Sequence, residues 1–116
     1  MKFNKAVPLL PVTDISIAIE FYQSKLGFDC VYNDTVFARM CANDVELYLW
    51  QQDVTPASRC RIMVSDLSSL YGAYLTTGAI NSATAVVLQP WGQKDFTLYD
   101  LCGNIITFCQ EHSYDY

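Results

Sequence analysis

The sequence lacks long hydrophobic runs, paired cysteines and a signal peptide, and each absence removes a class of protein. No stretch approaches the about 20 consecutive apolar residues of a membrane-spanning helix. The five cysteines show no Cys-x-x-Cys spacing and mostly fall in apolar segments, which indicates small buried side chains in a reducing compartment. Pro8, Pro11 and Asp14 interrupt the N-terminal segment before it reaches the length of a signal sequence. We therefore expect a soluble, cytoplasmic protein that does not enter a membrane.

The common catalytic and cofactor motifs are also absent. There is no Gly-x-Ser-x-Gly elbow, no phosphate-binding loop and no Gly-x-Gly-x-x-Gly. The single histidine, His112, lies in the polar C-terminal segment, where a free, solvated side chain is the ordinary state. It is badly placed to activate a cysteine nucleophile. The sequence thus predicts no catalytic residue and no cofactor.

Basic residues are few, because seven Lys and Arg stand against twelve Asp and Glu, for a net charge of −5. Nucleic-acid binders present a basic stripe, so this balance disfavours nucleic acid and fits a cationic small molecule or no charged partner. Between Asp29 and Asp53, five acidic residues stand against Arg39 alone. This local excess indicates either a solvated loop surface or part of a binding site.

Aromatic residues, in contrast, are plentiful. The chain has 116 residues, enough for one domain with a single core, and 14% of them are aromatic, including eight Tyr and two Trp. This is more than a small core needs, so we expect some of them on a partly exposed face. A subunit interface uses the same residue types and is the alternative interpretation.

The two halves of the chain follow one pattern. Val12-Thr13-Asp14-Ile15-Ser16 returns 52 residues later as Val64-Ser65-Asp66-Leu67-Ser68. Each Asp is positioned to cap an amphipathic helix, and the helices end at Gly27 and Gly78 with lengths that agree to one residue. Strands are predicted over 6–12, 28–32, 36–41 and 45–50, then through Arg59 and Arg61 and over 84–88, 96–99 and 105–109.

A repeat of this size predicts two supersecondary units that share one core. We expect a single α+β domain of two βαβββ repeats, about 1–53 and 58–112, in which a curved mixed sheet encloses a concave cavity. Strand alternation assigns the side chains. Val45, Leu47 and Leu49 are expected to face the helix, so Glu46, Tyr48 and Trp50 face the cavity. Tyr32 and Phe37 are expected on the same face, which would suit a flat cationic guest.

The segment Pro90-Trp91-Gly92 breaks the chain before a predicted hairpin that turns at Gly103-Asn104. A buried tryptophan is the ordinary case. In the repeat pattern, however, this loop lies at the rim of the concave face. Trp91 is therefore a candidate stacking surface for a ligand.

These motifs resemble those of a known superfamily. Val-x-Asp before each helix, Phe21-Tyr22 and Leu26-Gly27-Phe28 are similar to the vicinal oxygen chelate superfamily of glyoxalases. Ala6-Val7-Pro8, Gln89-Pro90-Trp91-Gly92 and Asp100-x-x-Gly103-Asn104 resemble the bleomycin resistance proteins within it. The resemblance implies a dimer that exchanges its N-terminal strand at a hinge around Pro8. It also implies sequestration of the drug without a reaction.

By the same resemblance, the drug's bithiazole would lie between Trp91 of one subunit and Phe37 of the other. Tyr32 and Trp50 would occupy further positions of the cleft. Acidic residues would meet the cationic tail of the drug, and the candidates on charge alone are Asp29, Asp34 and Asp53.

Enzymes of the superfamily hold a metal through His, Glu or Gln on inner strands. The corresponding positions here are Val7, Arg59 and Thr107, with Glu46 (or Tyr48 in a shifted register) as the one possible ligand. Val offers no donor atom and Arg repels a cation. The resemblance therefore implies a protein without metal or catalysis.

Arg59, Arg61 and Lys94 depart from this pattern, because cations are wrong for a cationic guest. Two alternatives stay open: a binder of another, possibly anionic, aromatic metabolite, and a divergent metal-dependent lyase, isomerase or transferase. The expected partners are a small molecule and a second copy of the chain, with no nucleic acid and no membrane. The predicted ligand-binding residues are Tyr32, Asp34, Phe37, Tyr48, Trp50, Arg59, Arg61, Trp91 and Gly92.

Overall fold

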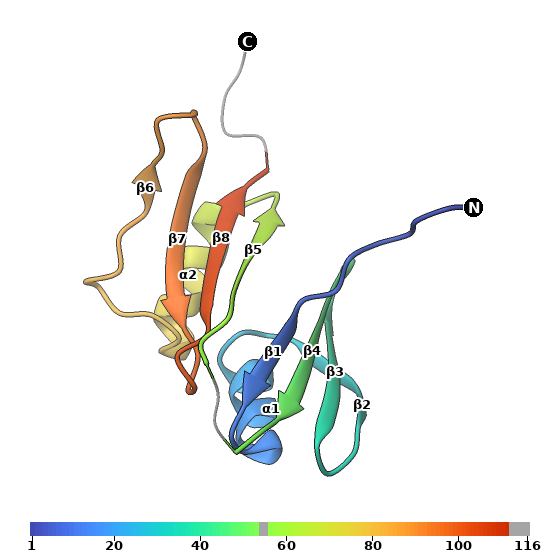
Figure 1. Cartoon of the computed structure of the whole chain (residues 1–116). Helices are drawn as coiled ribbons and strands as arrows, with labels where there is room; N and C mark the ends of the chain where they lie inside the picture. Colours follow the sequence, from blue (N-terminus) through green and yellow to red (C-terminus); the bar gives the residue numbers. More distant parts are fainter. Residues whose placement is uncertain (54–55, 112–116) are drawn as a thin grey trace.

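The computed structural model describes residues 1–53 and 56–111, which form two sheets, each with one helix against it (Figure 1). The first repeat contains β1 (Leu9–Val12), α1 (Ile15–Ser24), β2 (Asp29–Asn33), β3 (Phe37–Ala42) and β4 (Val45–Gln51). The second contains β5 (Arg59–Val64), α2 (Leu67–Thr77), β6 (Val87–Leu88), β7 (Lys94–Tyr99) and β8 (Ile105–Gln110). No helix in these residues is long and apolar enough to cross a membrane. His112, predicted to be free and solvated, lies outside the described residues.

The duplicated βαβββ order predicted from the sequence is confirmed, but the strands form two sheets and not one. Their orders are β1-β4-β3-β2 and β5-β8-β7-β6. In each sheet the first strand of the repeat pairs in parallel with the last, and the other pairs are antiparallel. β1 begins at Leu9 and not at Ala6. Pro8, just before it, has no N–H for a ladder, whereas Pro11 is tolerated inside β1 because β1 is an edge strand. β6 is reduced to two residues.

The repeat extends to the capping of the helices. The carboxylates of Asp14 and Asp66 each accept a hydrogen bond of 3.1 Å from a backbone N–H in the first turn, as predicted. The side-chain carbonyls of Gln51 and Gln110 also accept, at 2.8 Å each, the N–H of the first residue of α1 and α2. Each helix is thus fixed to the end of the last strand of its own repeat, a contact that the sequence did not indicate.

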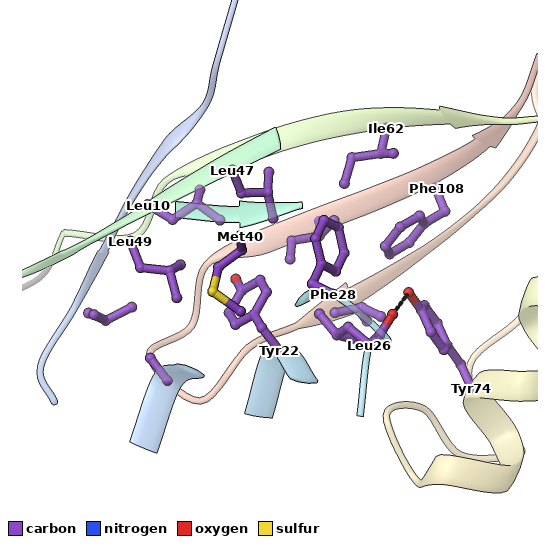
Figure 2. Close-up of a cluster of buried hydrophobic side chains, with 14 of the residues drawn as sticks. Leu10, Tyr22, Leu26, Phe28, Met40, Leu47, Leu49, Ile62, Tyr74 and Phe108 are labelled. Carbon is purple, nitrogen blue, oxygen red and sulfur yellow. Dashed lines mark hydrogen bonds between the residues drawn. The ribbon is translucent and has the colours of Figure 1, made fainter. Parts of the chain in front are cut away.

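The two repeats meet through equivalent residues. Lys25 Nζ donates to the carbonyl oxygen of Thr77, and Thr77 Oγ1 donates to that of Lys25, both at 2.8 Å. These residues are also 52 positions apart, so an approximate two-fold axis passes between the helix C-termini. Nearby, Tyr74 Oη donates to the carbonyl oxygen of Leu26 at 2.7 Å (Figure 2).

The core continues across both repeats. Leu47 and Leu49 are fully buried, which confirms that they face the helix. Figure 2 shows how side chains of the first repeat approach those of the second; the labelled residues are Leu10, Tyr22, Leu26, Phe28, Met40, Leu47, Leu49, Ile62, Tyr74 and Phe108. Of the cysteines, only Cys109 is buried and the other four are half-buried, so the prediction of small buried thiols is wrong for most of them.

A buried polar cluster connects the loop after β7 to the first repeat. Asp100 accepts hydrogen bonds from Tyr22 Oη at 2.7 Å and from Asn104 Nδ2 at 2.8 Å. Asn104, 0% exposed, also donates to the carbonyl oxygen of Pro11 at 2.8 Å and accepts from the N–H of Ser58 at 3.0 Å. Burial, with Asp100 nearby, raises the pKa of Tyr22 well above its usual range.

Candidate functional site

An aromatic face lies on the first sheet, on the side away from its helix. The register of the strands places Phe37 opposite Trp50 and Tyr48 opposite Arg39. The ring centroids of Tyr32 and Phe37 are 6.4 Å apart, and those of Phe37 and Tyr48 are 5.1 Å apart. Trp50 is 44% exposed. The structure thus brings together four of the residues predicted to bind the ligand, and we call them the aromatic face.

A buried carboxylate, that of Glu46, lies on β4 two residues before Tyr48. Glu46 accepts hydrogen bonds from Lys5 Nζ at 2.5 Å and from Arg39 Nε at 2.7 Å. Both cations lower the pKa of the Glu46 carboxyl. Lys5 is 41 residues away in the chain, so no sequence pattern indicated this pairing. The Glu46 carboxylate thus has two cationic partners within the chain and does not need a cationic ligand to neutralise it.

This cluster predicts a measurable pH dependence. The pKa of the Glu46 carboxyl is about 4.3 in the unfolded chain and is lower in the folded chain. Its ion pairs therefore stabilise the folded protein above that unfolded value, and this contribution is lost as the pH falls through the folded pKa. Urea unfolding at several pH values between about 6 and 3 should show a smaller acid-side loss of stability for Glu46→Gln than for the wild type. If the free energy of unfolding fell with pH equally in Glu46→Gln and in the wild type, the ion pairs of Glu46 would not be the source of the pH dependence.

The second sheet also carries a paired carboxylate. Asp95 accepts from Arg61 Nη2 and from Gln89 Nε2, both at 3.0 Å, and the hydrogen bond to Asp95 raises the pKa of Arg61. The guanidinium of Arg61, one of the predicted ligand-binding residues, therefore already has an acidic partner within the chain. Its role in binding a ligand stays a prediction. Arg59, two residues earlier on the same edge strand, makes no ion pair with the described residues.

Trp91 lies on the turn between β6 and β7. The turn is closed by hydrogen bonds from the N–H of Gln89 to the carbonyl of Gln93 at 2.8 Å and from the N–H of Gly92 to the carbonyl of Gln89 at 2.9 Å. Gly92 adopts a φ of 90°, which favours glycine. The indole is 59% exposed, yet its Nε1 donates to Gln93 Oε1 at 2.9 Å. This hydrogen bond holds an exposed ring in one orientation.

The predicted site residues do not all meet within one chain. Figure 1 shows the β6–β7 turn, which carries Trp91 and Gly92, on the side of the second repeat that lies away from the first sheet.

Asp34 has a local role, since it accepts from the N–H groups of Val36 and Phe37 and from Tyr32 Oη, all at 2.9 Å. The Val36 N–H and the Tyr32 hydroxyl lower the pKa of Asp34.

Two cavities open between the repeats. The smaller, about 540 Å³, lies between the N-terminal segment, the start of β4 and β5, and we call it the arm cavity. Its lining includes Val7, Glu46 and Arg59, three of the positions at which the resemblance would place metal ligands. Thr107 is instead hydrogen-bonded to Thr97, with the Oγ1 atoms 2.9 Å apart. No group of three His, Cys, Asp or Glu side chains in the described part of the chain is arranged for a metal ion.

The larger cavity, about 710 Å³, lies between the end of α1, the β3–β4 turn and α2. Its lining includes Leu26, Phe28, Ile62, Tyr74 and Phe108, which are core residues of both repeats. It contains none of the residues predicted to bind the ligand.

No protein-family model matches the chain. Among curated proteins, it is 29% identical to the bleomycin resistance protein of Geobacillus stearothermophilus, over 92% of this chain and 96% of the relative. Among solved structures, it matches the bleomycin-binding protein of the bleomycin producer Streptomyces verticillus, complexed with copper(II)-bleomycin. That match has a TM-score of 0.84 at 25% identity and covers 97% of this chain and 99% of the other. The chain has the glyoxalase/bleomycin resistance fold.

Other structures with this fold are more distant in sequence. A glyoxalase/bleomycin resistance protein/dioxygenase superfamily member from Sphaerobacter thermophilus is 19% identical, with a TM-score of 0.79 over 95% of this chain and 98% of the other. Such a match shows the fold alone. The resemblance drawn from Leu26-Gly27-Phe28 and Pro90-Trp91-Gly92 is confirmed, because the curated relatives are bleomycin resistance proteins.

Proposed function

We propose that the chain is a binding protein that sequesters bleomycin-type antibiotics without a chemical reaction. The observation that carries the proposal is the exposed aromatic face on the first sheet, together with the indole of Trp91 held in place by Gln93. Flat aromatic ligands stack on such surfaces. The similarity to bleomycin resistance proteins, and to a bleomycin-binding protein that was solved with the drug, supports this ligand class.

We propose further that the cleft forms between two copies of the chain. Trp91 and Phe37 lie on different repeats and, within one chain, are not brought together, so a second copy would supply the opposite side of a sandwich. Large apolar side chains stand exposed on both sheets, including Leu9 at 45%, Met63 at 42% and Tyr99 at 64%. Phe3, 91% exposed in the segment before Pro8, fits an arm that a partner covers.

The residue types at the site support binding and not catalysis. Glu46 and Asp95 are both neutralised by neighbouring cations, so neither carboxylate is poised as a general base. Val7, Arg59 and Thr107 would give a metal at most one weak ligand. The absence of metal, and the cytoplasmic location expected from the sequence, both remain predictions.

A titration tests the proposal directly. Addition of copper-free and copper(II)-bleomycin should give a saturable quench of tryptophan fluorescence, with one drug bound per chain and therefore two per dimer. Mass spectrometry after binding should recover the drug unchanged. A signal that does not saturate would contradict binding, and a modified drug would contradict the non-enzymatic role. Analytical ultracentrifugation of the same samples would test the dimer.

A further inference from the structure

Trp91 lies on a turn that the second sheet holds only weakly. The turn begins at Gln89 and follows β6, which has two residues and pairs with β7 over that length alone. Both β6 side chains are exposed, at 46% and 63%, so little burial fixes this strand. Figure 1 shows β6 at the outer edge of the second sheet, with β7 as its neighbour. A fixed orientation of the indole therefore calls for a further connection to the body of the domain.

The side chain of Gln89 supplies that connection. Its Nε2 donates to Asp95 Oδ1 at 3.0 Å, and its backbone N–H donates to the carbonyl of Gln93 at 2.8 Å. Gln93 Oε1 in turn accepts from the indole Nε1 of Trp91 at 2.9 Å. Gln89 thus joins the carboxylate of Asp95 to the residue that holds the indole.

Asp95 is a fixed anchor for this connection. It lies on β7 and is 4% exposed, and its second oxygen, Oδ2, accepts from Arg61 Nη2 at 3.0 Å. Arg61 belongs to β5, at the opposite edge of the sheet in the order β5-β8-β7-β6, so its side chain reaches across β8. Hydrogen bonds to a charged group are stronger than those between neutral groups. A continuous series of hydrogen bonds therefore runs across the whole second sheet, from β5 to Trp91.

We propose that Asp95 is a positioning residue for the ligand site. Through Gln89 it holds the turn in the orientation in which the indole of Trp91 can stack on a flat ligand, and an indole ordered before binding loses less entropy when the ligand arrives. Because Asp95 is buried, it acts on the ligand through Trp91 and not by contact. The identity of the ligand rests on the proposed function, whereas the order of the indole in the free chain follows from the hydrogen bonds alone.

NMR of the free chain measures this order directly. The chain has two tryptophans, so the indole N–H of Trp50 serves as an internal reference. Gln89→Met keeps the length of the side chain and removes its hydrogen bond to Asp95. It should lower the heteronuclear NOE of the Trp91 indole, which reports picosecond-to-nanosecond motion, and leave that of Trp50 unchanged. Gln23→Met, the same substitution at an exposed position on α1, should change neither value.

Two variants of Asp95 test the anchor itself. Asp95→Ala removes both side-chain hydrogen bonds and should lower the NOE of the Trp91 indole at least as much as Gln89→Met does. Asp95→Asn can still accept from Arg61, and it can donate to the side-chain carbonyl of Gln89 once that amide is reversed, so it should keep most of the order. The NMR spectrum reports whether each variant is folded. If Asp95→Ala is not, Gln89→Met, a change at a half-buried position, decides the question.

A double-mutant cycle with bleomycin, followed by calorimetry, separates positioning from direct contact. When Trp91 is present, Gln89→Met should weaken binding about threefold to tenfold, the cost of ordering one side chain on binding. In the Trp91→Ala background it should have no effect. The inference is overturned if Gln89→Met leaves the NOE of Trp91 unchanged, or if it weakens binding equally with and without Trp91. If bleomycin does not bind the wild type, the proposed function fails, and the NOE comparison still decides whether Asp95 positions the indole.

Discussion

Trp91→Ala is expected to weaken bleomycin binding by about 2 kcal/mol, roughly 30-fold. The indole is 59% exposed, so it adds little to the folded chain alone and can be covered when a flat ligand stacks on it. Its hydrogen bond to Gln93 at 2.9 Å fixes the ring before binding, and less entropy is lost when the ligand arrives. The affinity loss should therefore appear with an almost unchanged unfolding temperature.

Three comparisons sharpen this experiment. Trp91→Phe keeps an aromatic surface and should recover part of the affinity. Leu101→Ala removes an apolar side chain that is equally exposed, at 61%, but lies in the loop after β7, and it should change nothing. Phe37→Ala should weaken binding by a similar factor if Phe37 lies on the opposite side of the ligand. Unaltered affinity in Trp91→Ala, measured by calorimetry because the fluorophore is lost, would remove Trp91 from the site.

Asn104→Ala is expected to destabilise the protein by about 3 kcal/mol, the range found when a buried hydrogen-bond network is broken. The Asn104 side chain bonds to the carbonyl of Pro11, the N–H of Ser58 and the carboxylate of Asp100, at 2.8, 3.0 and 2.8 Å. Alanine would leave these groups with unmet hydrogen-bonding capacity in a place where water cannot replace the amide.

Urea unfolding would measure this loss against a matched control. Asn81→Ala removes one exposed hydrogen bond, from the N–H of Ala83 to Asn81 Oδ1 at 2.9 Å, and should cost less than about 1 kcal/mol. Asn104→Asp should be at least as harmful as alanine, because it brings a second carboxylate against Asp100. If Asn104→Ala and Asn81→Ala lost similar stability, the buried cluster would not be what joins the loop to the first repeat.

The fold was predictable because its signals are local and occur twice. Asp14 and Asp66 cap helices through their own first turns, and Gly78 ends α2 in the left-handed conformation that favours glycine. These signals also fixed the length of the repeat. The number of sheets was not predictable in the same way, because whether β1 and β5 join into one sheet depends on packing between the repeats.

The candidate site was predictable to the extent that it follows strand alternation. Alternation placed Glu46, Tyr48 and Trp50 on the face opposite Leu47 and Leu49. Leu47 and Leu49 are fully buried and Trp50 is 44% exposed, in agreement with this, whereas Glu46 is buried beneath its two cations. Alternation did not reveal how the charges are paired, since Arg61 and Asp95 are 34 residues apart and their contact depends on tertiary structure. The sequence indicated only a turn at Asn104. Its hydrogen bond to the carbonyl of Pro11 joins residues far apart in the chain, and no sequence pattern predicts such a contact.

The contact between Lys25 and Thr77 has a consequence for the ancestry of the fold. In a symmetric homodimer, when residue i of one subunit touches residue j of the other, j also touches i. Lys25 and Thr77 occupy equivalent positions, and each donates to the backbone carbonyl of the other at 2.8 Å. A half-length ancestor with one such repeat would make this contact twice across a true two-fold axis. The present chain can thus be described as a fused dimer whose halves have since diverged, with the Asp100–Asn104 loop as an asymmetric addition.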